Sequence, residues 1–211
     1  MSFIWIKICG ITREQDAHAV AKLGVDAIGL VFYPASPRAV TVTQATAVLR
    51  DIPRDLQVFG LFVNPSVQEV EAALGVPGIS HLQFHGNEPA AFCESFGVPY
   101  MKAFRVRSAQ ATLAEVENYQ TAQYILLDSY EKDVHGGTGK TFDWSYAATI
   151  ASECDAKIVL AGGLQPGNVV SAVETVHPFG VDVSSGVESA PGIKAIAKIE
   201  SFVKGVRSVG S

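Results

Sequence analysis

The segment Lys157-Ile-Val-Leu-Ala-Gly-Gly-Leu-Gln-Pro166 joins a short apolar run to a pair of glycines and then to a proline that suits the first turn of a helix. Comparable apolar runs recur along the whole chain of 211 residues, with helical stretches between them. They are nearly unbroken apolar sequence, which is typical of parallel strands buried on both faces. The predicted strands are residues 4–8, 27–32, 57–63, 80–84, 99–104, 123–127, 157–161 and 180–184.

Strands that alternate with helices indicate βαβ units and a parallel sheet. Eight such units predict an α/β fold, a closed (β/α)₈ TIM barrel, whose functional residues gather at the carboxyl ends of the strands. No linker-like change of composition divides the chain, so we expect a single barrel domain over residues 1–205. Residues 206–211 are expected to form a frayed tail.

Two kinds of pattern predict helices. Thr12-Arg-Glu-Gln15 and Ser66-Val-Gln-Glu69 fit the capping box, in which side chains bind unpaired backbone N–H groups of the first turn. Near the end of the chain, Ile196, Ile199 and Val203 recur at helical spacing and predict an apolar stripe that faces the core.

Composition limits the class of protein. Hydrophobic residues make up 48% of the chain and charged residues 18%, which favours a packed core over disorder. The formal net charge is −5 and Lys and Arg form no cluster, so we expect no nucleic-acid partner. Three cysteines do not indicate a disulfide framework, and neither a signal peptide nor a membrane-spanning run is evident. We therefore expect a soluble protein of the reducing cytoplasm.

Two small-residue turns follow the last two predicted strands. In barrels of this kind, these two connections commonly bind phosphate through backbone N–H groups. Glycine lets the backbone approach an anion closely, although a glycine pair also serves in ordinary turns. The position of both turns favours the phosphate site, and its predicted residues are Gly162, Gly163, Ser185 and Gly186.

A thiol and a carboxyl end two other predicted strands. Cys9 follows the first strand and, once ionised, can act as a base or a nucleophile; the alternative is a small buried apolar residue. Asp128 closes the run Tyr-Ile-Leu-Leu-Asp and is either a cap or a carboxyl that faces the barrel opening. Partial burial there would suit a general acid.

Three further polar residues are candidates for ligand binding. His85 ends the fourth predicted strand, and Arg38 lies in the loop 33–41, where it is either a clamp for a carboxylate or a solvated charge. Asp182 lies within the eighth strand and is either a second cavity carboxylate or an anchor for the phosphate turn. We favour the anchor.

The two longest connections after strands, residues 33–41 and 129–143, are expected to rim the opening, and the glycine-rich second one could close as a lid. The histidines and cysteines show no metal-ligand spacing, so no metal is expected. The chain also lacks the motifs of serine hydrolases, P-loop NTPases and dinucleotide-binding enzymes.

Motifs along essentially the whole chain resemble those of the phosphoribosylanthranilate isomerases, a family of (β/α)₈ enzymes of tryptophan biosynthesis. The most specific are Lys7-Ile-Cys-Gly-Ile-Thr12 and Gly180-Val-Asp-Val-Ser-Ser-Gly-Val-Glu188, in that order. The others are Gly29-Leu-Val-Phe32 with Ser36-Pro-Arg38, Leu82-Gln-Phe-His-Gly86, Leu126-Leu-Asp-Ser129, Gly136-Gly-Thr-Gly139 with Phe142, and Leu160-Ala-Gly-Gly-Leu164 with Pro166 and Asn168.

The resemblance implies an intramolecular oxidoreductase that converts N-(5-phosphoribosyl)anthranilate to 1-(2-carboxyphenylamino)-1-deoxyribulose 5-phosphate by an Amadori rearrangement. Asp128 would protonate the furanose ring oxygen, and Cys9 would remove the proton from C2. Arg38 would bind the anthranilate carboxylate, the glycine-rich turns would bind the phosphate, and His85 would line the pocket. A phosphosugar substrate is implied, with no metal or redox cofactor, and the choice between a monomer and a homodimer stays open.

Two residues depart from the family's pattern. Ala195 stands where an acid is usual after Pro-Gly-x-Lys, and Phe84 stands where leucine is more usual before His85. Three other readings remain. A sister isomerase of histidine biosynthesis would carry an aspartate in place of Cys9, a metal-dependent pentose-phosphate epimerase would need converging ligands, and a non-catalytic phosphosugar-binding barrel would tolerate loss of the acid or the base.

Overall fold

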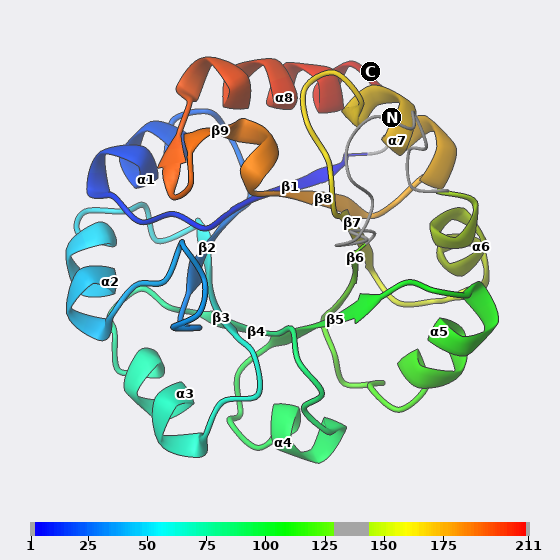
Figure 1. The fold of residues 1–211 in the computed structure, drawn as a ribbon, viewed down its shortest axis with the longest axis horizontal. Coiled ribbons are helices and arrows are strands. Elements are labelled where there is room, and N and C mark those ends of the chain that lie inside the picture. Colours follow the sequence, from blue (N-terminus) through cyan, green and yellow to red (C-terminus); the bar gives the residue numbers. More distant parts are fainter. Residues whose placement is uncertain (1–2, 129–143, 210–211) are drawn as a thin grey trace.

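The computed structural model describes residues 3–128 and 144–209. Its eight long strands are parallel and close into a barrel in sequence order, with the last strand paired to the first (Figure 1). The strands are β1 (Trp5–Cys9), β2 (Ala27–Val31), β3 (Gln57–Phe62), β4 (His81–Phe84), β5 (Tyr100–Arg105), β6 (Tyr124–Asp128), β7 (Ile158–Ala161) and β8 (Gly180–Val183). Each lies within one residue of its predicted range at both ends, so the predicted barrel is confirmed.

Helices form an outer ring around the strands (Figure 1). They are α1 (Glu14–Ala21), α2 (Val42–Val48), α3 (Val67–Leu74), α4 (Ala90–Glu94), α5 (Ala109–Val116), α6 (Ser145–Glu153), α7 (Val169–Val176) and α8 (Ile196–Val209). Between β8 and α8 lie a short 3₁₀ helix, η1 (Ser185–Val187), and a two-stranded hairpin of β9 (Glu188–Ala190) and β10 (Ile193–Lys194). Within the described ranges, no helix is long and apolar enough to cross a lipid bilayer.

The barrel strands are apolar on both faces because each face packs against a different layer. On the inner face, Trp5, Phe59 and Tyr124 fill the barrel, and the rings of Trp5 and Tyr124 stack with centroids 5.0 Å apart. On the outer face, residues such as Ile6 and Ile125 pack in the cluster that includes the helices. This double burial explains why the strands lack the alternation of half-exposed sheets.

One of the two predicted capping boxes is confirmed. Ser66 caps α3, where its hydroxyl accepts from the N–H of Glu69 and the Glu69 carboxylate accepts from the N–H of Ser66. The box at Thr12 is wrong, because α1 begins at Glu14 and the Thr12 hydroxyl donates to the carbonyl oxygen of Gly192 at 2.6 Å. A partner far along the chain has replaced the local one.

Two other expectations about helix ends need correction. Pro166 does not lie in the first turn of α7, which starts at Val169; it lies in the turn before. The pattern at Thr41, which sequence reasoning missed, is a complete capping box with Gln44 at the start of α2.

The C-terminal tail is helical rather than frayed up to Val209, so that part of the predicted tail is wrong. Val206 is fully buried beside Ile199 in the apolar stripe of α8. The Arg207 guanidinium donates to the carbonyl oxygens of Ile4 and Gly24. These contacts anchor the end of α8 to the amino-terminal end of the barrel.

A chain that ends after Gly205 should therefore be less stable than the full chain. It loses a buried valine and the hydrogen bonds of Arg207, which together are worth about 2–4 kcal/mol of the free energy of unfolding. Urea unfolding measures this difference, and Lys204→Ala, at an exposed position of the same helix, serves as the control. Equal stability of the truncated chain and the control would show that the contacts of Val206 and Arg207 contribute nothing.

Candidate active site

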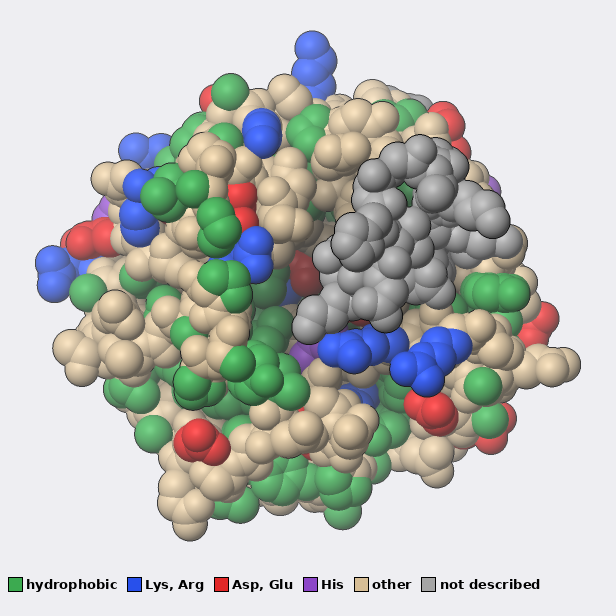
Figure 2. Space-filling view, in the orientation of Figure 1, with side chains coloured by type: hydrophobic (Ala, Val, Ile, Leu, Met, Phe, Trp, Pro, Cys, Tyr) green, Lys and Arg blue, Asp and Glu red, His purple; other side chains and the backbone are tan. Residues whose placement is uncertain are grey.

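The polar residues predicted from the sequence converge on one end of the barrel. Cys9 and Asp128 are the last residues of β1 and β6, His85 follows β4, and Asp182 lies in β8. Because the strands are parallel, their carboxyl ends face one opening. Figure 2 looks onto the molecule along this axis and shows a central hollow in which acidic, basic and histidine side chains are visible.

Asp128 and His85 form a hydrogen-bonded pair. The His85 Nε2 lies 3.1 Å from Asp128 Oδ2, and the other ring nitrogen, Nδ1, lies 3.4 Å from Gln83 Nε2. If the Gln83 amide donates to Nδ1, the histidine carries its proton on Nε2 and donates it to the carboxylate. Both side chains of the pair are partly exposed, at 21% and 20%. The carboxyl is thus held in a fixed place while solvent and ligand can reach it.

Cys9 lies deeper, beside a buried ion pair. Lys7 is fully buried, and its Nζ lies 3.0 Å from Asp182 Oδ1. Burial opposes the charge on Lys7, but Asp182 and Cys9 outweigh it, so the pKa of the lysine is above its ordinary value. Burial raises the pKa of the Cys9 thiol, and the charges of Lys7 and Lys194 offset only part of that effect. Asp182 is therefore the partner of Lys7, a different supporting role from the anchor of the phosphate turn that the sequence favoured.

Arg38 is held by a second network. Its Nε and Nη2 donate to the two carboxylate oxygens of Glu188, at 2.8 and 2.7 Å, and Lys194 Nζ donates to the same carboxylate at 2.8 Å. Burial favours the neutral acid, but these hydrogen bonds outweigh it and lower the pKa of Glu188. Arg38 is thus no free loop charge, because Glu188 fixes its orientation.

Arg38 also lies close in space to Gly10, the residue that follows Cys9. A Cβ built on Gly10 would be 2.5 Å from Arg38 Cδ and 2.9 Å from Ser184 Oγ. The residue after Cys9 must therefore be small for the arginine stem to cross the end of β1 at this distance.

The two turns predicted to bind phosphate touch each other. A Cβ built on Gly186 would be only 1.9 Å from the carbonyl oxygen of Leu164, which directly follows the glycine pair. Gly162 and Gly163 both adopt left-handed backbone conformations, with φ of 82° and 64°. Asn168 Nδ2 donates to the carbonyl oxygen of Gly163 at 3.0 Å and stabilises the turn. The first N–H groups of η1 have no partner within that helix, as at any helix start.

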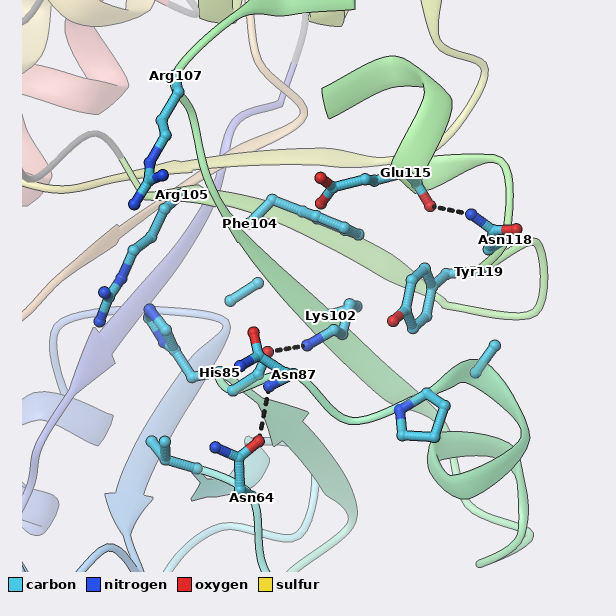
Figure 3. Close-up of a pocket in the computed structure, with 15 residues that line it drawn as sticks. Asn64, His85, Asn87, Lys102, Phe104, Arg105, Arg107, Glu115, Asn118 and Tyr119 are labelled. Carbon is cyan, nitrogen blue, oxygen red and sulfur yellow. Dashed lines mark hydrogen bonds between the residues drawn. The ribbon is translucent and has the colours of Figure 1, made fainter. Parts of the chain in front are cut away.

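A pocket of about 1030 Å³ opens beside His85 (Figure 3). Arg105 and Arg107, both exposed, extend on the side of the His85 ring. Deeper in the pocket, Lys102 pairs with Glu88 at 2.9 Å and donates to the carbonyl oxygen of Gly86 at 2.6 Å. The buried pair thus braces the loop that carries His85, and the exposed arginines favour an anionic ligand.

Sequence reasoning missed several residues that support the site. Lys7 and Gln83 each precede a candidate, Cys9 and His85, by two positions, and period-two alternation puts such pairs on one strand face. A polar residue inside an apolar run was the available signal. Glu188 carries no such local signal, since its partner Arg38 is 150 residues away in the chain.

The structure describes one of the two loops that were predicted to rim the opening. Of the two loops predicted to rim the opening, 33–41 carries Arg38, and 129–143 lies outside the described residues. Among the residues that are described, no group of three or more His, Cys, Asp and Glu is arranged to hold a metal ion.

Comparisons with known proteins give one consistent result. A family model described as N-(5'-phosphoribosyl)anthranilate (PRA) isomerase matches residues 6–205. The N-(5'-phosphoribosyl)anthranilate isomerase of Pseudomonas putida (strain W619) is 49% identical over 207 residues, which cover 98% of this chain and 99% of the relative.

Solved structures agree. A phosphoribosyl anthranilate isomerase in complex with reduced 1-(o-carboxyphenylamino)-1-deoxyribulose 5-phosphate has a TM-score of 0.85 and 34% identity, over 98% of this chain and 100% of that one. Monomers of a dimeric phosphoribosylanthranilate isomerase from Thermotoga maritima match with a TM-score of 0.85, 34% identity and the same coverage.

The contact between the two turns can be tested by Gly186→Ala. The added methyl group would force the turns apart, so the variant should lose about 1–3 kcal/mol of stability, as overpacked sites do. It should also bind inorganic phosphate more weakly, as measured by calorimetry. Gly167→Ala is the matched control, because a Cβ there meets nothing within 4 Å. Indistinguishable behaviour of the two variants would argue against the close contact.

Proposed function

The chain belongs to the N-(5'-phosphoribosyl)anthranilate isomerase family, and we propose that Asp128 and Cys9 are the general acid and general base of its reaction. It is an isomerase of tryptophan biosynthesis that converts N-(5-phosphoribosyl)anthranilate to 1-(2-carboxyphenylamino)-1-deoxyribulose 5-phosphate. The observation that carries the proposal is the placement of a carboxyl and a thiol at the same end of the barrel, on separate strands. No observation favours the histidine-pathway isomerase, the epimerase or the binding-only barrel.

Ring opening is the first step that the site must catalyse. Asp128 gives a proton to the furanose ring oxygen, the C1–O bond breaks, and the nitrogen lone pair forms a Schiff base with C1. His85 holds the carboxyl through its contact with Oδ2, and solvent, which reaches the partly exposed carboxyl, returns a proton to Asp128 afterwards. Partial exposure of the pair lets the acid reach both the sugar and solvent.

Proton removal from C2 is the second step. Cys9, as the thiolate, accepts that proton, and the electron pair moves to form an enolamine that tautomerises to the ketone product. One proton is added at oxygen and one is removed from carbon, so the rearrangement balances without an oxidant or a reductant. The acid and the base end separate strands, β6 and β1, so each has its own surroundings.

Charged groups at both ends of the substrate have partners in this arrangement. We assign the anthranilate carboxylate to Arg38, whose orientation Glu188 fixes, and the phosphate to the turns that contain Gly162, Gly163, Ser185 and Gly186. His85 lines the pocket. The role that we assign to Asp182 is to hold Lys7, rather than to contact the reacting atoms.

The setting of the enzyme is also proposed. Cys9, Cys93 and Cys154 are all free, which supports a reducing cytoplasm. The relative from Thermotoga maritima is described as dimeric, so a homodimer and a monomer both remain candidates for this chain. The partner that we assign is the phosphosugar substrate alone, without nucleic acid.

Replacing the acid or the base should abolish most of the turnover. Cys9→Ala and Asp128→Asn should each lower kcat by about 10²–10⁴-fold, as loss of a positioned acid or base does. The measurement is the loss of fluorescence of phosphoribosylanthranilate that is generated in situ. Cys154→Ser, at the end of α6, is the control and should keep wild-type turnover. Near-wild-type kcat in either variant would remove that residue from the mechanism.

Replacing Arg38 should act on binding rather than on chemistry. Arg38→Ala loses a charge-assisted contact, so KM should rise about 10–100-fold while kcat changes little. Arg50→Ala removes an exposed arginine near the end of α2 and should change neither constant. A lower kcat with unchanged KM in Arg38→Ala would contradict the assignment of the carboxylate.

A further inference from the structure

The side chain of Lys7 is fully buried, and its amino group contacts a carboxylate and an aromatic ring. It lies 3.0 Å from a carboxylate oxygen of Asp182 and 5.6 Å above the centroid of the Phe59 ring. It precedes Cys9 by two residues in β1, so both side chains point into the barrel. A buried lysine costs much free energy unless it is paired, and a residue of this kind calls for a functional reason.

Gly29 in β2 shows how close the lysine and the thiol are. Its register partner in β1 is Cys9. A Cβ built on Gly29 would lie 2.9 Å from Cys9 Sγ and 3.2 Å from Lys7 Nζ. Its φ is not in the left-handed region, so the backbone does not require glycine here. The space that any side chain would take is occupied by the sulfur and the amine together.

The charges around Cys9 come from four elements. Lys7 in β1 and Lys194 in β10 oppose the effect of burial on the pKa of the thiol, whereas Asp182 in β8 adds to it. Arg38 from the loop 33–41 also interacts with the sulfur. Each of these cations has a carboxylate partner: Glu188 for Lys194 and Arg38, and Asp182 for Lys7. Lys7 is the one that shares the space beside Gly29 with the sulfur. Its effect is the largest of those that favour ionisation.

We propose that Lys7 is a positioning residue for the isomerase reaction: its ammonium group, held by Asp182 and given room by Gly29, stabilises the Cys9 thiolate that removes the C2 proton. The inference rests on the proposed role of Cys9 as the base. The thiol first releases its proton to water, and the ammonium group keeps its own three protons throughout. When Cys9 takes the proton from C2, the Lys7–Asp182 pair is left electrically balanced.

The ionisation of Cys9 can be followed without substrate by its rate of alkylation with iodoacetamide, as a function of pH. All variants are made in the full chain that carries Cys154→Ser, and the peptide containing Cys9 is quantified by mass spectrometry. Cys93 is fully buried, and its alkylation is not counted because only the peptide containing Cys9 is quantified. Lys7→Met should move the midpoint of the alkylation profile upward by about one to three pH units, which is the usual effect of one adjacent charge. An unmoved midpoint would overturn the inference.

A double variant separates a direct effect on sulfur from a loss of pairing. Lys7→Met leaves Asp182 buried without its partner, and that negative charge alone would hinder ionisation of the thiol. Lys7→Met combined with Asp182→Asn removes both charges, and its midpoint should stay above that of the parent. A return to the parent midpoint would mean that Lys7 serves only to neutralise Asp182, which would overturn the inference.

If Lys7→Met does not fold, the alkylation midpoint of Asp182→Asn alone still tests the inference. It leaves the lysine beside the sulfur and removes a negative charge, so the midpoint should fall below that of the parent. An unchanged or higher midpoint would overturn the inference. Circular dichroism and thermal unfolding of each variant establish that the titration reports on folded protein.

If Cys9 is not the base, the experiment gives a different result from the one expected if Lys7 does not act on Cys9. In the pH profile of kcat/KM, the midpoint of the acidic limb should follow the alkylation midpoint in every variant, because both report the Cys9 thiolate. If the alkylation profile moves and the limb of kcat/KM does not, Cys9 is not the base, and the catalytic part of the inference falls with that role. If neither moves, Lys7 does not act on Cys9, whatever the base is.

Discussion

The parallel pairing of β8 with β1 is the constraint on which the rest of the structure depends. It closes the barrel and makes Lys7 and Asp182 register partners, so the ion pair under the thiol exists only once the first and last strands have met. A Cβ on Gly180 would be 2.7 Å from the carbonyl oxygen of Trp5, which shows how tightly the two strands approach at the bottom of the barrel. Closure and assembly of the site are therefore one event.

Three buried ionic groups lie next to three site residues, and this placement explains why the fold keeps them. The Lys7–Asp182 pair lies beside Cys9, Lys102–Glu88 braces the loop of His85, and Lys194 with Glu188 holds Arg38. Buried ion pairs contribute little net stability, because desolvation offsets the attraction, yet breaking one is costly. In the proposed mechanism, rigid placement of the reacting side chains is the benefit that offsets this cost, since catalysis depends on geometry held within fractions of an ångström.

The sequence was sufficient for features whose cause is local or periodic. The strands could be predicted to within one residue because burial on both faces leaves apolar runs, and the box at Ser66 because its two partners are three residues apart. The frayed tail was wrong because the partners of Arg207 lie 203 and 183 residues away. For the same reason, Cys9 and Asp128 could be named as strand-end candidates, whereas the pairing of Lys7 with a residue 175 positions away could not.

The two departures from the family's pattern lie outside the reacting centre. The side chain of Phe84 points away from the barrel interior and packs in an aromatic cluster with Phe62 and Tyr100, so the larger ring alters the outer core and leaves His85 free to face the opening. Ala195 starts α8 without a capping side chain, but its N–H donates to the carbonyl oxygen of Val187 and ties the helix to η1. This contact fixes where α8 begins, but it does not accept from the N–H groups of the first turn, as an acidic side chain at this position would. Both residues lie in contacts that hold the barrel together, and neither is among the residues proposed to catalyse the reaction.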